Sequence, residues 1–181
     1  MKKIIAALLL MLTITTAFAQ GEAHTWAIKT ALGADFTDFE RPERQLKLDL
    51  GIGYNINENV YIGFATGTIG RLGKTEAEAF YALPLLGDVT FSFPTKSGWM
   101  PYIQTRGGFI VNTNKNFTNK KGQEVEGAHL TTFEVEPGLS INLSEKMTLQ
   151  MGIYYRRIMK LEGYGHNQNA YGAKLGLVFH L

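Results

Sequence analysis

Apolar and polar residues alternate along most of the chain after its first twenty residues. Residues 45–54, for example, read Gln-Leu-Lys-Leu-Asp-Leu-Gly-Ile-Gly-Tyr. Successive side chains of a β-strand point to opposite faces, so a period of two indicates strands rather than helices. The alternation recurs in eight segments, most of about ten residues, which lie near 26–34, 45–54, 60–65, 82–93, 103–111, 133–143, 147–156 and 171–181.

The connections between these expected strands are short and long in turn. Short turns cover residues 55–59, 94–100 and 144–146, and longer loops cover residues 36–44, 69–80, 112–127 and 159–169. Short turns at one end and long loops at the other are typical of antiparallel up-and-down β-barrels. Pro84 and Pro137 fall inside two expected strands, where we expect a bulge or a strand end because proline lacks an N–H donor.

Alternation alone leaves open which face of the barrel is apolar, because a soluble lipocalin-like barrel has the same period with its apolar side chains inside. The polar face here is rich in small residues and carries nine charges: Lys29, Lys47, Asp49, Asp88, Arg106, Glu134, Glu136, Arg156 and Lys174. We expect these charges to form a paired network in the interior, since a buried unpaired charge is costly.

The apolar face carries one charge, Arg157, near the loop end of its strand. A charge that faces lipid at mid-depth costs about 2–4 kcal/mol, so this nearly uncharged face favours a lipid-facing wall. Aromatic residues near strand ends fit the girdles of membrane proteins, namely Trp26, Tyr54, Tyr102, Tyr155 and Tyr171. We therefore predict an all-β fold, an eight-stranded antiparallel up-and-down transmembrane β-barrel with a plugged polar interior too narrow for a diffusion pore.

The first nineteen residues have the parts of a secretory signal peptide. A positive start is followed by an apolar run and by the small-residue pattern Ala17-Phe18-Ala19. We expect cleavage after Ala19, so that residues 20–181 form one outer-membrane β-barrel domain. The chain has 18 Lys+Arg, 16 Asp+Glu and no cysteine. Its excess cations, Lys2 and Lys3, lie in the leader, so we expect no nucleic-acid partner, and the lack of cysteine excludes thiol catalysis.

The signal peptide, the eight strands and the alternating closing segment 171–181 together resemble the small bacterial outer-membrane β-barrels of the OmpX and OmpA type. Residues 81–86 and 101–103 are similar to segments of the same domain. The resemblance implies a location in the outer membrane of a Gram-negative cell. It also implies the barrel assembly machinery as a partner that reads the last strand. That family usually ends in Phe, whereas this chain ends in Leu181, with Phe179 two residues earlier.

Some outer-membrane barrels are enzymes, and His166-Asn167-Gln168-Asn169 resembles the His-x-Ser-Asn segment of PagL-type lipid A deacylases. Gln168 stands at the position of the nucleophilic serine, and an amide cannot act as that nucleophile. We therefore expect no catalytic residue. The four histidines, His24, His129, His166 and His180, lack ligand spacing, so we expect neither a metal nor a cofactor.

The expected function is structural or interactive at the cell surface, through the four longer loops and above all through residues 112–121. Arg157 and Lys160 lie near the loop rim, where they are candidates to contact the phosphates of outer-membrane lipid and lipopolysaccharide. Two other function classes stay open at this point. One is a barrel enzyme that acts on outer-membrane lipid, and the other is a soluble periplasmic lipocalin-like barrel that binds an apolar ligand.

Overall fold

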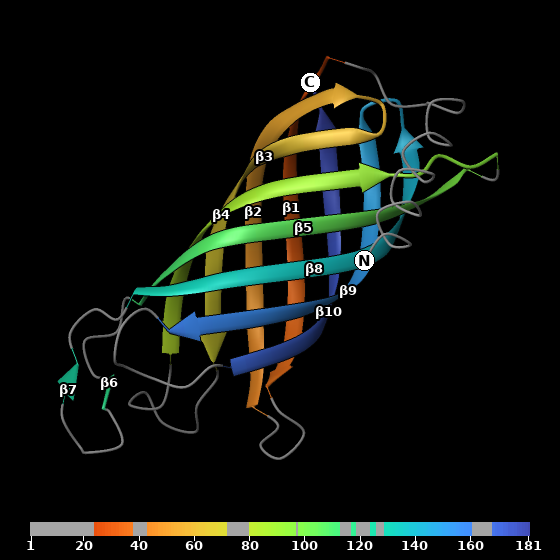
Figure 1. Cartoon of the computed structure of the whole chain (residues 1–181). Helices are drawn as coiled ribbons and strands as arrows, with labels where there is room; N and C mark the ends of the chain where they lie inside the picture. Colours follow the sequence, from red (N-terminus) through yellow and green to blue (C-terminus); the bar gives the residue numbers. More distant parts are fainter. Residues whose placement is uncertain are drawn as a thin grey trace, which may run out of the picture.

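A computed structural model describes residues 24–37, 43–71, 80–96, 98–112, 117–118, 124–125, 129–160 and 168–181. Within these ranges, eight long antiparallel strands form one closed barrel (Figure 1). They are β1 (Trp26–Thr37), β2 (Glu43–Asn57), β3 (Val60–Arg71), β4 (Phe80–Ser92), β5 (Trp99–Asn112), β8 (His129–Ser144), β9 (Met147–Lys160) and β10 (Gln168–His180). A separate two-stranded sheet pairs β6 (Phe117–Thr118) with β7 (Glu124–Val125). The predicted eight-stranded antiparallel barrel is confirmed.

Each barrel strand pairs with its neighbour along the chain, and β1 pairs with β10 to close the wall. The strands of the front wall in Figure 1 cross those of the back wall steeply, which is the strong tilt that a small closed barrel requires. The described part of the chain contains no helix that is long and apolar enough to cross a membrane.

The strands are longer than the alternation predicted. β1 runs through Thr37 and β2 begins at Glu43, so residues 36, 37, 43 and 44 of the expected loop 36–44 belong to strands. Ile69 was expected in a loop but lies inside β3 and is 2% exposed. The extension follows from backbone pairing, because hydrogen bonds between neighbouring strands continue past the point where the side-chain pattern fades. What remains of the four longer loops lies mostly outside the described residues, apart from β6 and β7, and so does the expected signal peptide.

Neither Pro84 nor Pro137 causes a bulge or ends its strand, which corrects the expectation from sequence. Beside Pro84, the β3–β4 pairing stops after Thr66 and Leu85 and resumes in the same register at Ile69 and Ala82. The β8–β9 pairing has a matching gap beside Pro137 and also keeps its register. Each proline therefore removes ladder contacts on one side only, while the strand continues because its other neighbour, β5, stays paired.

The two faces of the wall are turned as a membrane barrel requires. Large apolar side chains point outward, with Phe64 76%, Leu32 67% and Ile153 67% exposed. The polar parity of each strand points inward, and its charges are buried. A lipocalin-like barrel has the opposite arrangement, so the alternative with an apolar interior is wrong for the described strands.

Candidate functional site in the barrel interior

The interior of the barrel contains a cluster of charged side chains from seven of the eight barrel strands that the structure describes. The nine charged residues of the polar parity whose side chains the structure describes are each 8% exposed or less. They come from β1 (Lys29), β2 (Lys47, Asp49), β4 (Asp88), β5 (Arg106), β8 (Glu134, Glu136), β9 (Arg156) and β10 (Lys174). Alternation directs each of them inward, and the closed barrel then brings together residues that are far apart in sequence. We call this set the ionic cluster.

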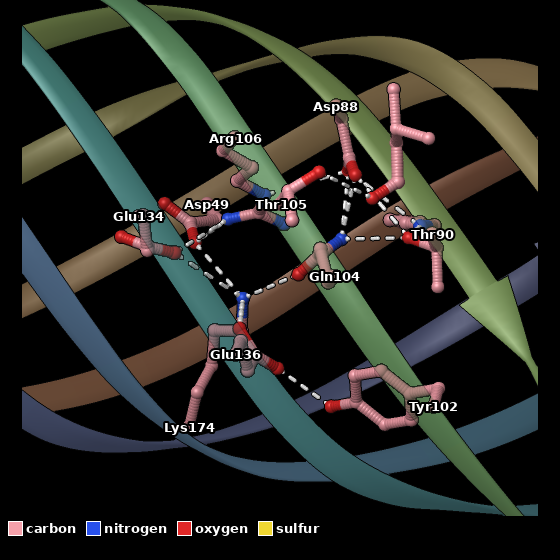
Figure 2. Close-up of polar contacts among 12 residues, drawn as sticks. Asp49, Asp88, Thr90, Tyr102, Gln104, Thr105, Arg106, Glu134, Glu136 and Lys174 are labelled. Atoms are coloured by element: carbon pink, nitrogen blue, oxygen red, sulfur yellow. Dashed lines mark hydrogen bonds and ion pairs between the residues drawn. The ribbon is translucent and has the colours of Figure 1, made fainter. Parts of the chain in front are cut away.

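Asp49 and Glu134 lie at the centre of the ionic cluster. Arg106 Nη1 lies 2.5 Å from Asp49 Oδ2, and Lys47 Nζ lies 3.2 Å from the same oxygen. Lys47 Nζ also donates a hydrogen bond of 2.5 Å to Glu134 Oε2. Figure 2 shows Arg106, Asp49 and Glu134 converging on one point inside the wall. Shared partners of this kind compensate the cost of removing several charges from water at once.

Lys174 joins the cluster to β8 and β5. Its ammonium forms an ion pair with Glu136 and donates a hydrogen bond of 2.9 Å to Gln104 Oε1. Tyr102 donates a hydrogen bond of 2.6 Å to the other oxygen of Glu136 (Figure 2). Tyr102 is 2% exposed and therefore belongs to the interior. Its assignment to an aromatic girdle was wrong, because its even position on β5 shares the inward parity of Gln104 and Arg106.

Asp88 and Lys29 continue the cluster toward the end of the barrel with the short turns. Arg106 Nε lies 3.5 Å from Asp88 Oδ2, and Gln104 Nε2 donates to both oxygens of Asp88. Lys29 Nζ lies 3.6 Å from Asp88, donates to Thr90 Oγ1 at 2.8 Å and sits 3.5 Å from the centre of the Tyr61 ring. Sequence reasoning did not single out Gln104 and Thr90, because uncharged side chains of the inward parity carry no distinctive pattern.

Arg156 lies at the other end of the cluster. It is 1% exposed, and its backbone pairs with that of Glu134 across β8 and β9. Beyond it, toward the loop end, the described interior becomes apolar, with a buried cluster of Ile69, Ala82, Ile110 and Ile158. The described interior therefore has three zones along the barrel axis: a polar zone at the turn end, the ionic cluster, and an apolar zone at the loop end.

Interior tyrosines lie against glycines of neighbouring strands. A Cβ atom on Gly172 would come within 2.5 Å of the Tyr154 hydroxyl, and one on Gly138 would come equally close to the Tyr102 hydroxyl. Inward glycines thus leave room for rings inside a barrel that is otherwise filled by side chains. The chain contains 20 glycines, and at these two positions glycine has a packing role.

The candidate lipid-contact residues and the outward aromatic pairs lie near the two ends of the barrel. Arg157 is exposed on the outer face near the end of β9, one outward row beyond Tyr155, whose ring centre lies 5.2 Å from that of Tyr171. Lys160 is the last residue of β9, and its side chain lies outside the described part. At the turn end, Trp26 and Tyr54 form a second outward pair with ring centres 5.6 Å apart.

The residues compared with PagL-type enzymes do not form a described site. His166 and Asn167 lie outside the described residues, as does the side chain of Gln168. Asn169 accepts a hydrogen bond of 2.9 Å from Tyr155 on the adjacent strand. Among the described residues, no group of three or more His, Cys, Asp or Glu side chains is arranged to hold a metal ion.

Comparison with known proteins gives matches of structure only. No protein-family model and no curated protein matches the sequence. The crystal structure of Neisserial surface protein A (NspA) matches with a TM-score of 0.63 at 14% identity, over 87% of this chain and 97% of that chain.

Two further structural matches are to an attachment invasion locus protein and to an outer membrane enzyme. Ail, the attachment invasion locus protein of Yersinia pestis, matches with a TM-score of 0.54 at 14% identity, over 90% of this chain and 100% of that one. The outer membrane enzyme PagL matches with a TM-score of 0.55 at 12% identity, over 84% of this chain and 98% of that one. At such identities the likeness concerns the fold, which hosts different functions. This chain has the fold of the small eight-stranded outer-membrane β-barrels.

Proposed function

We propose that this protein is an integral outer-membrane β-barrel with a closed interior, and that it acts at the cell surface through its loops. One observation carries the proposal: the wall is inverted relative to a soluble protein, with leucine, isoleucine and phenylalanine outward and nine charged residues buried inward. Such a wall is unstable in water and stable in lipid, because apolar side chains then meet acyl chains while each buried charge keeps partners.

The spacing of the outward aromatic pairs supports a membrane-spanning wall. Trp26 begins β1 at the turn end, and Phe36 pairs near the loop end with Tyr171 of β10. Ten residues of a strand with a rise of about 3.3 Å and a tilt of about 45° span about 23 Å along the membrane normal. That height agrees with the apolar band of about 25 Å in outer-membrane barrels.

Export and assembly complete the proposal. Residues 1–19 act as a cleaved signal peptide, so that the mature protein begins at Gln20. The closing strand β10, where Phe179 is exposed on the outer face, and the exposed Leu181 that follows it form the segment that the barrel assembly machinery reads. Mass spectrometry of the purified protein tests the cleavage. We expect a mature N-terminus at Gln20.

Surface partners are proposed for the loops and for the loop-end rim. Ail has been solved in complex with the heparin analogue sucrose octasulfate, which is a precedent for ligand binding on this fold. Here the candidate contact regions are residues 36–44, 69–80, 112–127 and 159–169. Arg157 and Lys160 are proposed to contact phosphates of lipopolysaccharide, since a guanidinium beyond an aromatic pair lies at headgroup depth.

An enzymatic role is not part of this proposal. PagL shares the fold, but a shared fold carries no activity. The position that would need a hydroxyl nucleophile is Gln168. Loss of a lipid-modifying activity on substitution of His166 would reopen this question.

Membrane fractionation followed by gel mobility with and without boiling tests the proposed function. A closed barrel in the outer membrane resists carbonate washing and migrates faster in detergent before boiling than after it. Recovery in the soluble periplasmic fraction, with a single mobility, would overturn the proposal.

A further inference from the structure

The turn end of the barrel holds a cavity of about 620 Å³ that the proposed function does not use. Described residues from all eight barrel strands and two turns line it, and most of them carry uncharged hydroxyl or amide groups, such as Asn55, Thr90, Ser140, Asn142 and Gln150. The volume lies within the range of about 300–1,000 Å³ that is usual for small-molecule sites. We call this cavity the vestibule.

The vestibule is a dead end within the described structure. Lys29 and Thr90 line it and join it to the ionic cluster, where Gln104 donates a hydrogen bond of 3.2 Å to Thr90. Beyond the ionic cluster lies the buried apolar zone around Ile69 and Ile110. A solute that enters from the turn end therefore meets polar walls, then paired charges, then packed apolar side chains. The solute can bind in the vestibule, but the described interior gives it no path across the barrel.

Two polar atoms of the vestibule lack hydrogen-bond partners within the described chain. The hydroxyl of Tyr61, a lining residue that is 5% exposed, makes no hydrogen bond, and neither does Oε2 of Glu58 at the rim. A buried polar atom without a partner is costly, and water or a ligand usually satisfies it. By contrast, Lys29 is already held by Thr90, by Asp88 and by the Tyr61 ring.

The charges along the vestibule select against ions of either sign. Glu58 and Glu145, on the β2–β3 and β8–β9 turns, line its rim, whereas the ammonium of Lys29 lines its inner part. An anion meets the rim carboxylates first, and a cation meets the ammonium inside. A neutral molecule with several hydroxyl groups avoids both repulsions and exchanges hydrogen bonds with the amide and hydroxyl lining.

We propose that the vestibule is a binding site for a small neutral polyhydroxylated solute, of the size of a mono- or disaccharide, that enters and leaves at the turn end. The site is independent of the loops and of the rim around Arg157. Its occupant contacts the unpartnered hydroxyl of Tyr61 and the side-chain amide of Gln150, and the ionic cluster stops it from crossing the barrel.

The absence of cysteine from the natural chain allows a clean labelling test in the intact folded barrel. Met100→Cys places a thiol in the vestibule, which Met100 lines, Ala82→Cys places one in the buried apolar zone, and Lys146→Cys places one on the exposed β8–β9 turn. A small water-soluble thiol reagent should label Met100→Cys and Lys146→Cys but not folded Ala82→Cys. Labelling of Ala82→Cys as fast as Met100→Cys in a barrel that still shifts on boiling would overturn the dead end.

Sucrose serves as the neutral probe for occupancy. We expect it to slow labelling of Met100→Cys about tenfold when it is in about tenfold excess over its dissociation constant, and to leave Lys146→Cys unaffected. Glucose 6-phosphate, glucosamine and glycine betaine are the anionic, cationic and zwitterionic probes. No protection by sucrose, or stronger protection by any charged probe, would overturn the proposal.

Binding to a barrel without an engineered thiol gives an independent readout. Saturation-transfer NMR should show sucrose signals with the natural chain and a loss of most of that signal with Tyr61→Phe and Gln150→Leu combined. Leu149→Ala, on the outer face of the same strand, is the matched control and should keep the signal. An unchanged signal in the double variant would place the sugar elsewhere.

Discussion

Lys47 of β2 donates a hydrogen bond of 2.5 Å to Glu134 of β8, a residue 87 positions away in the sequence and across the barrel interior. Both side chains are 1% exposed. Neither group has access to bulk water, so each depends on the other and on the shared partners Asp49 and Arg106. The pair shows how the plugged interior is held together.

Glu134→Gln should lower the free energy of unfolding by about 3–5 kcal/mol, because it leaves the buried ammonium of Lys47 without its nearest anion. Urea unfolding of the barrel in lipid vesicles measures the change. Lys146→Gln, on an exposed turn, is the control and should change little. The double variant Lys47→Met with Glu134→Leu should recover part of the loss. A cost below about 1 kcal/mol for Glu134→Gln would contradict the central role of the pair.

Gly172→Ala should destabilise the barrel by about 1–3 kcal/mol, as overpacking of a filled interior does. The added methyl group would lie 2.5 Å from the Tyr154 hydroxyl and 2.5 Å from the carbonyl oxygen of Ala34. Gly87→Ala, at an exposed glycine on the outer face of β4, is the control, since its new atom would meet nothing closer than Gly107 O at 3.7 Å. Unfolding titrations of both variants decide the matter, and equal effects would show that ring packing against glycine is unimportant.

Leu32→Arg should cost about 2–4 kcal/mol in a bilayer, the range for a charge on the lipid-facing wall at mid-depth. Leu32 is 67% exposed near the middle of β1, where its register partners are Leu48 and Leu175. Met159→Arg, on the outward face at the loop end of β9, should cost about 0–1 kcal/mol. The comparison is made by unfolding from the same vesicles. Similar costs at both positions would argue against a membrane-spanning wall.

Arg157→Gln should reduce the preference of the barrel for phosphate-rich lipid. The residue is exposed and, among the barrel-strand side chains that the structure describes, it is the one charged side chain on the outer face. A measurement compares the thermal stability of the natural chain and the variant in vesicles with and without lipopolysaccharide. We expect the stabilising effect of lipopolysaccharide to fall in the variant, by about 0.5–1 kcal/mol for one exposed charge contact. Asn169→Ala, at the register partner of Arg157, is the neighbouring control. An identical effect of lipopolysaccharide on the stability of the natural chain and of Arg157→Gln would show that Arg157 makes no such contact.

Local pattern was sufficient for the strands and their faces. The alternation through residues 45–54 places Lys47 and Asp49 on one side and Leu46 and Leu48 on the other, and the structure shows the same division. This success has a physical reason, because a strand whose two faces meet lipid and a polar interior must alternate in every residue. The parity also places Tyr102 inside, and the girdle assignment failed because it considered the distance from the strand end and disregarded parity.

Tertiary structure alone decided which charges pair, how far the strands extend, and how the interior is divided. The pairing of Lys47 with Glu134 and of Arg106 with Asp49 depends on strand tilt and on register around a closed wall, which relate residues 87 and 57 positions apart. The apolar zone at Ile69 and the vestibule at the turn end likewise appear only when eight strands close. The sequence determines the face on which a side chain lies, whereas closure of the barrel determines which residues that side chain contacts.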